Sequence, residues 1–185
     1  MTIHTGRALL DAAKILQEAG LSEGQTYVDF GCGTLGHFVL PAAGLVGTKG
    51  RVYAFDILPG ALTAINERAR TEKILPLETI WGDLEHERGT EKIPAASADL
   101  ASLINITGVL FKSRTPIRNV NRVLKNGGRL LIVDWFKNSR LGSLMSAHPA
   151  EPDKIKETLE ASGFRLLKTL RAGMNHYGFL FEKIR

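Results

Sequence analysis

Val28-Asp29-Phe30-Gly31-Cys32-Gly33-Thr34-Leu35-Gly36-His37-Phe38 is the stretch that decides the fold of this 185-residue chain. A predicted strand, residues 26–30, runs into a glycine-rich turn, and we expect a helix over residues 36–45. Glycines in such a turn let backbone N–H groups approach a ligand to contact distance, where a Cβ would obstruct them. The spacing of the three glycines is that of the dinucleotide-binding fingerprint. The stretch therefore predicts a site for a cofactor that carries a nucleotide.

The remainder of the chain alternates predicted strands and helices. Alternating βα units imply a parallel sheet with helices on both faces, and ligands of such sheets bind outside the carboxyl ends of the strands. We therefore expect a doubly wound α/β fold that is Rossmann-like. The expected strands cover residues 51–56, 78–81, 99–106, 130–134, 164–170 and 176–183, and the expected helices cover residues 7–19, 59–72 and 152–163, with another beginning at Thr115-Pro116.

The composition indicates a single-domain protein without an intrachain disulfide or an apolar membrane-spanning run. The chain is 44% hydrophobic, which suits one domain with a core and is too little for two, so we expect a single domain over residues 1–185. A single cysteine, Cys32, excludes an intrachain disulfide and favours a reducing cytoplasm. The first residues lack the apolar run of a signal peptide, and no window reaches the run of about 18 apolar residues typical of a membrane span.

The positive charge lies mainly in the second part of the chain. The net charge is +5, and residues 112–185 carry an excess of lysine and arginine over acidic residues. Solvated basic helices explain this pattern, and so does a basic face for an acidic partner such as nucleic acid. No arginine-rich block or aromatic RNA-binding motif supports the nucleic-acid interpretation. The sequence is also compatible with a homo-oligomer.

Three acidic residues narrow the choice of cofactor. Asp29 lies two residues before Gly31, where a carboxylate would face the pyrophosphate of a dinucleotide, but it suits a cofactor with an ammonium group and a sulfonium. Asp56 follows Gly36 by 20 positions at the end of the second strand and can accept both ribose hydroxyls. Asp83 follows the third strand and can accept an amino proton from adenine.

With these residues the chain resembles the class I S-adenosylmethionine-dependent methyltransferases, from about residue 5 to 183. The first motif is Val28 to Thr34, the second strand ends in Asp56, and Gly82-Asp83-Leu84 resembles the adenine-site motif. Arg122 to Leu130 resembles the passage from the fourth main helix to the fifth strand. In texture the chain is similar to the small ubiquinone/menaquinone-biosynthesis-type methyltransferases.

The resemblance implies a strand order of 3-2-1-4-5-7-6 with the seventh strand antiparallel, and it implies S-adenosylmethionine as the cofactor. Asp29 would hold the methionine amino group, Asp56 the ribose and Asp83 the adenine amino group. Ile57 and Leu84 would pack on the adenine ring, and the backbone of Asn105 would lie near the reacting methyl. The implied cofactor-binding residues are Asp29, Gly31, Cys32, Gly33, Asp56, Ile57, Gly82, Asp83, Leu84 and Asn105.

One position departs from the family pattern. The family turn usually has glycine where this chain has Leu35, and Gly36 comes one residue late. Either Leu35 replaces a glycine or the turn carries a one-residue insertion. Both interpretations leave Gly31 and Gly33 usable by the cofactor.

The predicted function is methyl transfer from S-adenosylmethionine to an unidentified acceptor. Methyl transfer from a sulfonium needs a general base only where the acceptor must lose a proton, and the candidate bases are His148, His176 and Asp134. Trp135 and Phe136 are core or rim aromatics with substrate stacking as the alternative role. The helix at 7–19 and the segment 137–150, a candidate mobile loop, are available to cover the acceptor.

Two other functions remain alternatives, and no metal site is expected. The first is a non-catalytic module that binds S-adenosylmethionine, and the second is an NAD(P)-dependent oxidoreductase, for which the chain lacks a catalytic Tyr-x-x-x-Lys. The five histidines show no metal-ligand spacing. Cys32 has no evident base beside it, so we expect a packing residue rather than a nucleophile.

Overall fold

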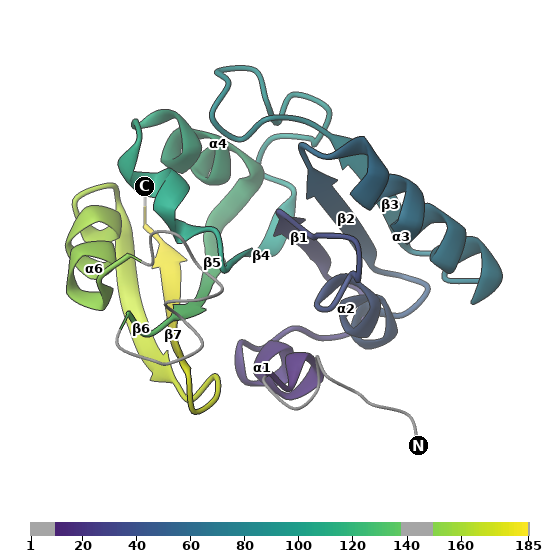
Figure 1. The fold of residues 1–185 in the computed structure, drawn as a ribbon, viewed down its shortest axis with the longest axis horizontal. Helices are drawn as coiled ribbons and strands as arrows, with labels where there is room; N and C mark the ends of the chain where they lie inside the picture. Colours follow the sequence, from purple (N-terminus) through teal and green to yellow (C-terminus); the bar gives the residue numbers. More distant parts are fainter. Residues whose placement is uncertain (1–9, 138–149, 185) are drawn as a thin grey trace.

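The computed structural model describes residues 10–137 and 150–184 and contains a seven-stranded sheet (Figure 1). The order is β3-β2-β1-β4-β5-β7-β6, with β7 antiparallel to β5 and to β6 and all other pairs parallel. This confirms the expected topology. The strands are β1 (Thr26–Phe30), β2 (Arg51–Asp56), β3 (Leu77–Trp81), β4 (Ala98–Ile104), β5 (Leu124–Trp135), β6 (Phe164–Leu170) and β7 (His176–Lys183).

Helices cover both faces of the sheet, as Figure 1 shows. One hydrophobic cluster joins the sheet to α1, α2 and α3, and a second joins its opposite face to η1, α4 and α6. The segment 137–150 falls almost entirely outside the described residues, as does the start of the expected helix at 7–19. The helical elements are α1 (Ala12–Glu18), α2 (Val39–Val46), α3 (Pro59–Thr71), η1 (Thr107–Phe111), α4 (Thr115–Val123) and α6 (Pro152–Glu160).

Strand alternation decides which side chains meet on each face. Successive residues of a strand point to opposite faces. In β1, Val28 and Phe30 pack in the cluster that contains α4, whereas Tyr27 packs in the cluster that contains α1 and α2. Asp29 therefore points to the α1–α2 face, and Asp56, which lies two residues after Ala54 of that same cluster, points there too.

The structure corrects three predicted boundaries. The helix after the glycine turn begins at Val39 instead of Gly36, because Gly36 has a left-handed φ of 56° that a helix cannot continue through. The fourth strand ends at Ile104 instead of Ile106, because Asn105 also has a positive φ, of 59°. The fifth strand begins at Leu124, and a register shift against β4 accommodates the Asn126-Gly127-Gly128 segment that we expected to precede the strand as a turn.

Gly36 is required by packing as well as by its φ. A Cβ at this position would lie 2.4 Å from Cδ1 of Ile65, a fully buried residue of α3. Leu35, in contrast, is 70% exposed. The glycine of the turn thus contacts α3 while its leucine neighbour projects away from the core.

Within the described residues, no helix is long and apolar enough to cross a membrane.

Candidate cofactor site

The glycine turn is hydrogen-bonded to the end of β2. The N–H groups of Gly31 and Cys32 donate to the carbonyl of Phe55, at 2.8 and 3.1 Å. The N–H of Gly33 donates to the Asp56 carboxylate at 2.9 Å. A Cβ added at Gly33, whose φ is 63°, would meet no described atom within 4 Å, so this side of the backbone faces open space. The turn therefore presents bare backbone to a ligand, as a cofactor-binding glycine must.

Asp56 is a buried carboxylate with two backbone donors. One oxygen accepts the Gly33 N–H, and the other accepts the N–H of Leu58, just before α3, at 2.9 Å. The oxygen that accepts from Gly33 also accepts from the Cys32 thiol at 4.0 Å, so of the about four acceptor positions of a carboxylate the one beside Leu58 is left for a ribose hydroxyl. The sequence predicted only the ligand contact. The structure adds that Asp56 also joins the glycine turn to the start of α3.

Asp29 lies deeper and belongs to a buried network. Its Oδ1 accepts a hydrogen bond from Ser102 of β4 at 2.6 Å, and the side chain is 2% exposed. Burial raises the pKa of Asp29 to about 7, and the negative charge of Asp56 adds to the rise, while the hydroxyl groups of Ser102 and Tyr27 oppose it. A carboxylate with this pKa is easily ionised by a neighbouring cation. The arrangement suits the ammonium group of a bound cofactor.

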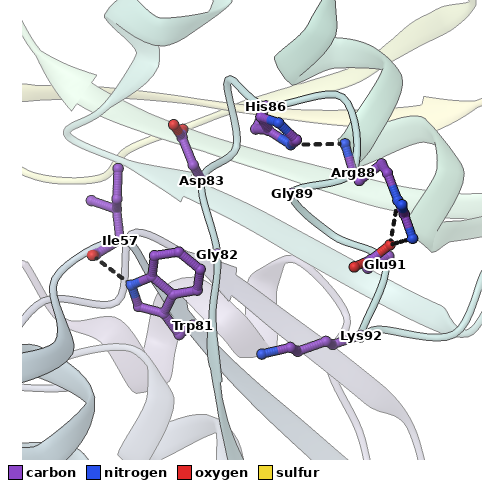
Figure 2. A pocket seen from close by; sticks show the side chains of 9 residues that line it. All are labelled: Ile57, Trp81, Gly82, Asp83, His86, Arg88, Gly89, Glu91 and Lys92. Carbon is purple, nitrogen blue, oxygen red and sulfur yellow. Dashed lines mark hydrogen bonds and ion pairs between the residues drawn. The ribbon is translucent and has the colours of Figure 1, made fainter.

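The third acid lines a cavity. A cavity of about 430 Å³ lies beside the end of β3, within the size range of small-molecule sites (Figure 2). Figure 2 shows Ile57 and Trp81 on one side, joined by a 3.0 Å hydrogen bond from the indole N–H to the Ile57 carbonyl, and the loop of residues 83–92 on the other. The lining residues are Ile57, Trp81, Gly82, Asp83, His86, Arg88, Gly89, Glu91 and Lys92.

The cavity contains Ile57, Gly82 and Asp83 of the predicted adenine site but not Leu84. The Leu84 side chain is buried in the hydrophobic cluster on the other face of the sheet. Trp81 takes the place next to Ile57 that the sequence analysis gave to Leu84. Leu84 lies in the loop three residues beyond the end of β3, and the hydrogen bond from Asn119 of α4 to its carbonyl holds that loop against the opposite face.

Two residues that sequence reasoning did not assign to the site hold the wall of this cavity. The Asn119 side chain, buried in α4, donates to the carbonyls of Leu84 and His86, each at 2.8 Å. The Arg122 guanidinium donates to the carbonyls of Thr90 and Ile93. The sequence does contain a signal for this role of Asn119, because its polar side chain lies beside the apolar stripe of α4. An amide buried there without hydrogen-bond partners would cost free energy, which predicts that it has partners.

The carboxyl ends of β4 and β5 and the beginning of β7 form the other half of this edge. Asn105 donates its N–H to the carbonyl of Val133 at 2.8 Å, which joins the end of β4 to β5. Asp134, a predicted base candidate, accepts from the N–H and hydroxyl of Thr107 through one oxygen and from the N–H of Trp135 through the other, which keeps one acceptor position. Its pKa is raised by burial. Asp134 therefore fastens η1 to β5.

His176 differs from Asp134 in having no partner. Both ring nitrogens are buried without a hydrogen-bond partner in the described structure. The ring lies against Trp135, with centroids 3.8 Å apart, and β-sheet pairing sets the two residues opposite each other. Burial lowers the pKa of His176 to about 4, so the ring is neutral at pH 7. The third candidate, His148, lies outside the described residues.

The remaining predictions concern Cys32 and metals. Cys32 is a buried free thiol, and burial followed by the charges of Asp29 and Asp56 raises its pKa far above its ordinary value. A thiol of this kind is a poor nucleophile, which agrees with a packing role. Among the residues that the structure describes, no group of His, Cys, Asp and Glu side chains is arranged to hold a metal ion.

Comparison with known proteins places the chain in a family. A family model described as "Methyltransferase domain" matches residues 21–171. The ubiquinone/menaquinone biosynthesis C-methyltransferase UbiE of Klebsiella pneumoniae is 31% identical over 123 residues, which are 64% of this chain and 46% of the relative. The chain thus spans less than half the length of the curated relatives that it matches.

Solved structures agree on the fold. An S-adenosylmethionine-dependent methyltransferase from Aquifex aeolicus superposes with a TM-score of 0.84 at 23% identity, covering 97% of this chain and 93% of that one. The [4+2]-cyclase SpnF superposes with a TM-score of 0.75 at 16% identity, covering 93% of this chain and 79% of that one. With the sheet order and the family match, these likenesses lead to one assignment. The chain belongs to the methyltransferase domain family, in the class I branch that uses S-adenosylmethionine as methyl donor.

Proposed function

We propose that this protein transfers a methyl group from S-adenosylmethionine, bound over the carboxyl ends of β1, β2 and β3, to an acceptor bound over the carboxyl ends of β4 and β5 and the beginning of β7. The observation that carries this proposal is the placement of Asp29, Asp56 and Asp83 at the ends of three neighbouring parallel strands. Asp29 pairs with Ala54, Asp56 lies two residues further along, and Asp83 lies two residues beyond Trp81, the partner of Asp56. The acids therefore follow one another along the sheet edge.

Each part of the site suits one part of the donor. Asp29 offers a buried carboxylate to the ammonium, and Gly31 and Gly33 offer backbone without Cβ atoms to the methionine portion. Asp56 keeps a free acceptor position for a ribose hydroxyl on the oxygen that accepts from Leu58. Asp83 and the cavity beside β3 suit adenine, with Ile57 and Trp81 as its apolar wall. The other proposed cofactor-binding residues contribute their backbone or pack beside the donor site: Cys32, Gly82, Leu84 and Asn105.

The chemistry requires little more than positioning. When bound, S-adenosylmethionine supplies a methyl group that its sulfonium already activates for displacement. The protein's part is to hold the acceptor in line, an effect that corresponds to effective molarities of roughly 10⁵–10⁸ M in well-oriented systems. The three hydrogen bonds that Asp134 accepts fit a positioning role. His176, neutral and without a partner, is the described histidine that could take a proton from the acceptor.

The first acceptors to test follow from the curated relatives. Their name specifies C-methylation in ubiquinone and menaquinone biosynthesis, and so hydroxylated aromatic quinone precursors form the first panel.

One sheet with its covering helices supports a single domain over residues 1–185. The buried thiol of the single cysteine is compatible with the cytoplasm that we propose as the compartment.

Calorimetric titration tests the proposal. S-adenosylhomocysteine should bind with a stoichiometry of one, and NAD⁺ should not bind. Production of S-adenosylhomocysteine should then depend on an added acceptor from the panel. Binding of NAD⁺ without binding of S-adenosylhomocysteine would contradict the donor site. Binding of S-adenosylhomocysteine in a protein that methylates none of a broad panel would favour the non-catalytic module.

A further inference from the structure

Asp29 is the end of a buried chain of hydroxyl groups. The phenol oxygen of Tyr27 lies 2.6 Å from Ser102 Oγ, and Ser102 Oγ lies 2.6 Å from Asp29 Oδ1. Tyr27 and Ser102 have no exposed surface, and Asp29 is 2% exposed. The chain runs from β1 to β4 and back to β1, and all of its side chains lie on the α1–α2 face.

The direction of the hydrogen bonds follows from counting hydrogens. Ser102 has one hydroxyl hydrogen, and an ionised Asp29 can only accept. Ser102 therefore donates to Asp29, and the Tyr27 hydroxyl must donate to Ser102. Linked hydroxyls polarise one another in a low dielectric, so the Tyr27 bond strengthens the one that reaches the carboxylate. Both groups favour the charged form of Asp29.

Other charged groups act in the opposite sense. Burial and the negative charge of Asp56, from β2, favour the protonated form of Asp29. Cys32, in the glycine turn, interacts unfavourably with Asp29, and its own pKa is raised so far that it stays a neutral thiol. Burial and the charge of Asp29 raise the pKa of Tyr27 well above its usual range, so Tyr27 stays a neutral donor. The two hydroxyls are therefore what keeps Asp29 ionisable near neutral pH.

We propose that Tyr27 and Ser102 are positioning residues for donor binding: their hydroxyls hold the Asp29 carboxylate ionised and oriented toward the ammonium of S-adenosylmethionine. This inference rests on the proposed function, which places the ammonium at Asp29. At a pH below the pKa of Asp29, binding then releases the Asp29 proton to solvent. Removing either hydroxyl makes that ionisation harder, so the pH at which the donor binds should move upward.

Calorimetric titration of S-adenosylhomocysteine between pH 5.5 and 8.5 tests this inference. The wild type, Tyr27→Phe and Ser102→Ala are compared, and binding is repeated in two buffers of different ionisation enthalpy to count released protons. In the wild type, affinity should rise about tenfold per pH unit below pH 7 and then level off, as expected when one proton must leave before a charged contact forms.

The variants should shift this profile. We expect the rising part to move upward by about 0.5–1 pH unit in Tyr27→Phe and by more in Ser102→Ala, which removes the direct donor. At pH 7, where about half of the wild-type Asp29 is ionised, that shift corresponds to roughly 2–5-fold weaker binding. The matched control is Tyr53→Phe, because Tyr53 is also buried, lies on the adjacent β2 with its hydroxyl hydrogen-bonded to Arg51, and belongs to the opposite face. Its profile should equal that of the wild type.

The outcomes separate the two proposals. A wild type that binds no S-adenosylhomocysteine at any pH contradicts the proposed function. A wild type that binds with a flat profile, or variants that lose thermal stability while the profile stays in place, overturns the relay alone. If both variants unfold, carboxyl ¹³C NMR of the wild type decides, because an Asp29 that has ionised by about pH 7 supports the relay and one that stays protonated well above pH 7 overturns it.

Discussion

The backbone N–H of Gly33 donates to the Asp56 carboxylate at 2.9 Å, so the glycine turn and the second strand share one buried acid. The second oxygen of Asp56 accepts from Leu58 ahead of α3. One side chain thereby sets the relative position of the turn, the strand end and the helix start. Ligand binding and local stability should both depend on it.

Asp56→Ala should weaken S-adenosylhomocysteine binding by tenfold or more, and it should lower the free energy of unfolding by about 1–3 kcal/mol, because it leaves two backbone donors unpaired. Calorimetry and urea denaturation measure the two effects. The control is Asp153→Ala, which removes an exposed pair with Lys156 and a first-turn acid of α6 and should lower stability by less than about 1 kcal/mol without changing binding. Unchanged binding in Asp56→Ala would contradict the proposed ribose site.

Asp29 should make the ligand-free protein less stable as the pH rises. Its pKa is about 7 in the folded protein and near 4 when unfolded, so the folded state holds the proton longer. The contribution is complete below pH 4 and is lost as the pH rises through 7, with a maximum of about 4 kcal/mol. Urea denaturation should show the wild type losing stability relative to Asp29→Asn between pH 4 and 7. A constant difference between the two proteins across this range would disprove the raised pKa.

Gly36→Ala should destabilise the fold by about 1–3 kcal/mol, because the new Cβ would clash with Ile65 and the residue has a left-handed φ. Thermal denaturation measures the change. Gly60→Ala is the matched control, since Gly60 lies in α3 with no described atom within 4 Å of an added Cβ. That control should leave stability unchanged or raise it by up to about 1 kcal/mol. Equal effects at the two glycines would refute the packing argument.

His176→Phe should not destabilise the protein at pH 7, because it replaces a buried ring without hydrogen-bond partners by an apolar ring that still packs on Trp135. The wild type should lose stability on acidification from pH 6.5 to 4, since the unfolded histidine takes up a proton and the folded one, with a pKa of about 4, does not. The variant should lack up to about 3 kcal/mol of this loss.

The same variant tests the proposed proton acceptor. His176→Phe should keep the affinity for S-adenosylhomocysteine while methyl transfer to a hydroxylated aromatic acceptor decreases. Urea denaturation at several pH values and a turnover assay measure the two aspects separately. Wild-type turnover in the folded variant would exclude His176 from proton transfer.

The sequence by itself determined the order of strands and helices, the glycine turn and the acids at three strand ends. These features are local: alternating apolar runs, glycines in a turn and acids after strands can be recognised without knowing what lies opposite them. The resemblance to class I methyltransferases then supplied the sheet order, which the structure confirms. The predicted start of the second helix at Gly36 and the predicted end of the fourth strand at Ile106 were wrong. The positive φ of Gly36 and of Asn105 depends on contacts with neighbouring elements, which a local sequence pattern does not contain.

Only the tertiary structure decided what the acids contact. The sequence separates Asp29 from Ser102 by 73 positions, and no periodic pattern indicates that their side chains meet at 2.6 Å. The same holds for Asn119 and the loop that walls the cavity, and for His176 on Trp135. Hydrogen bonding and burial act across the sheet, between residues whose positions depend on strand register and face. For that reason the sequence predicted which strand ends carry the acids, whereas the fold set their partners and their pKa values.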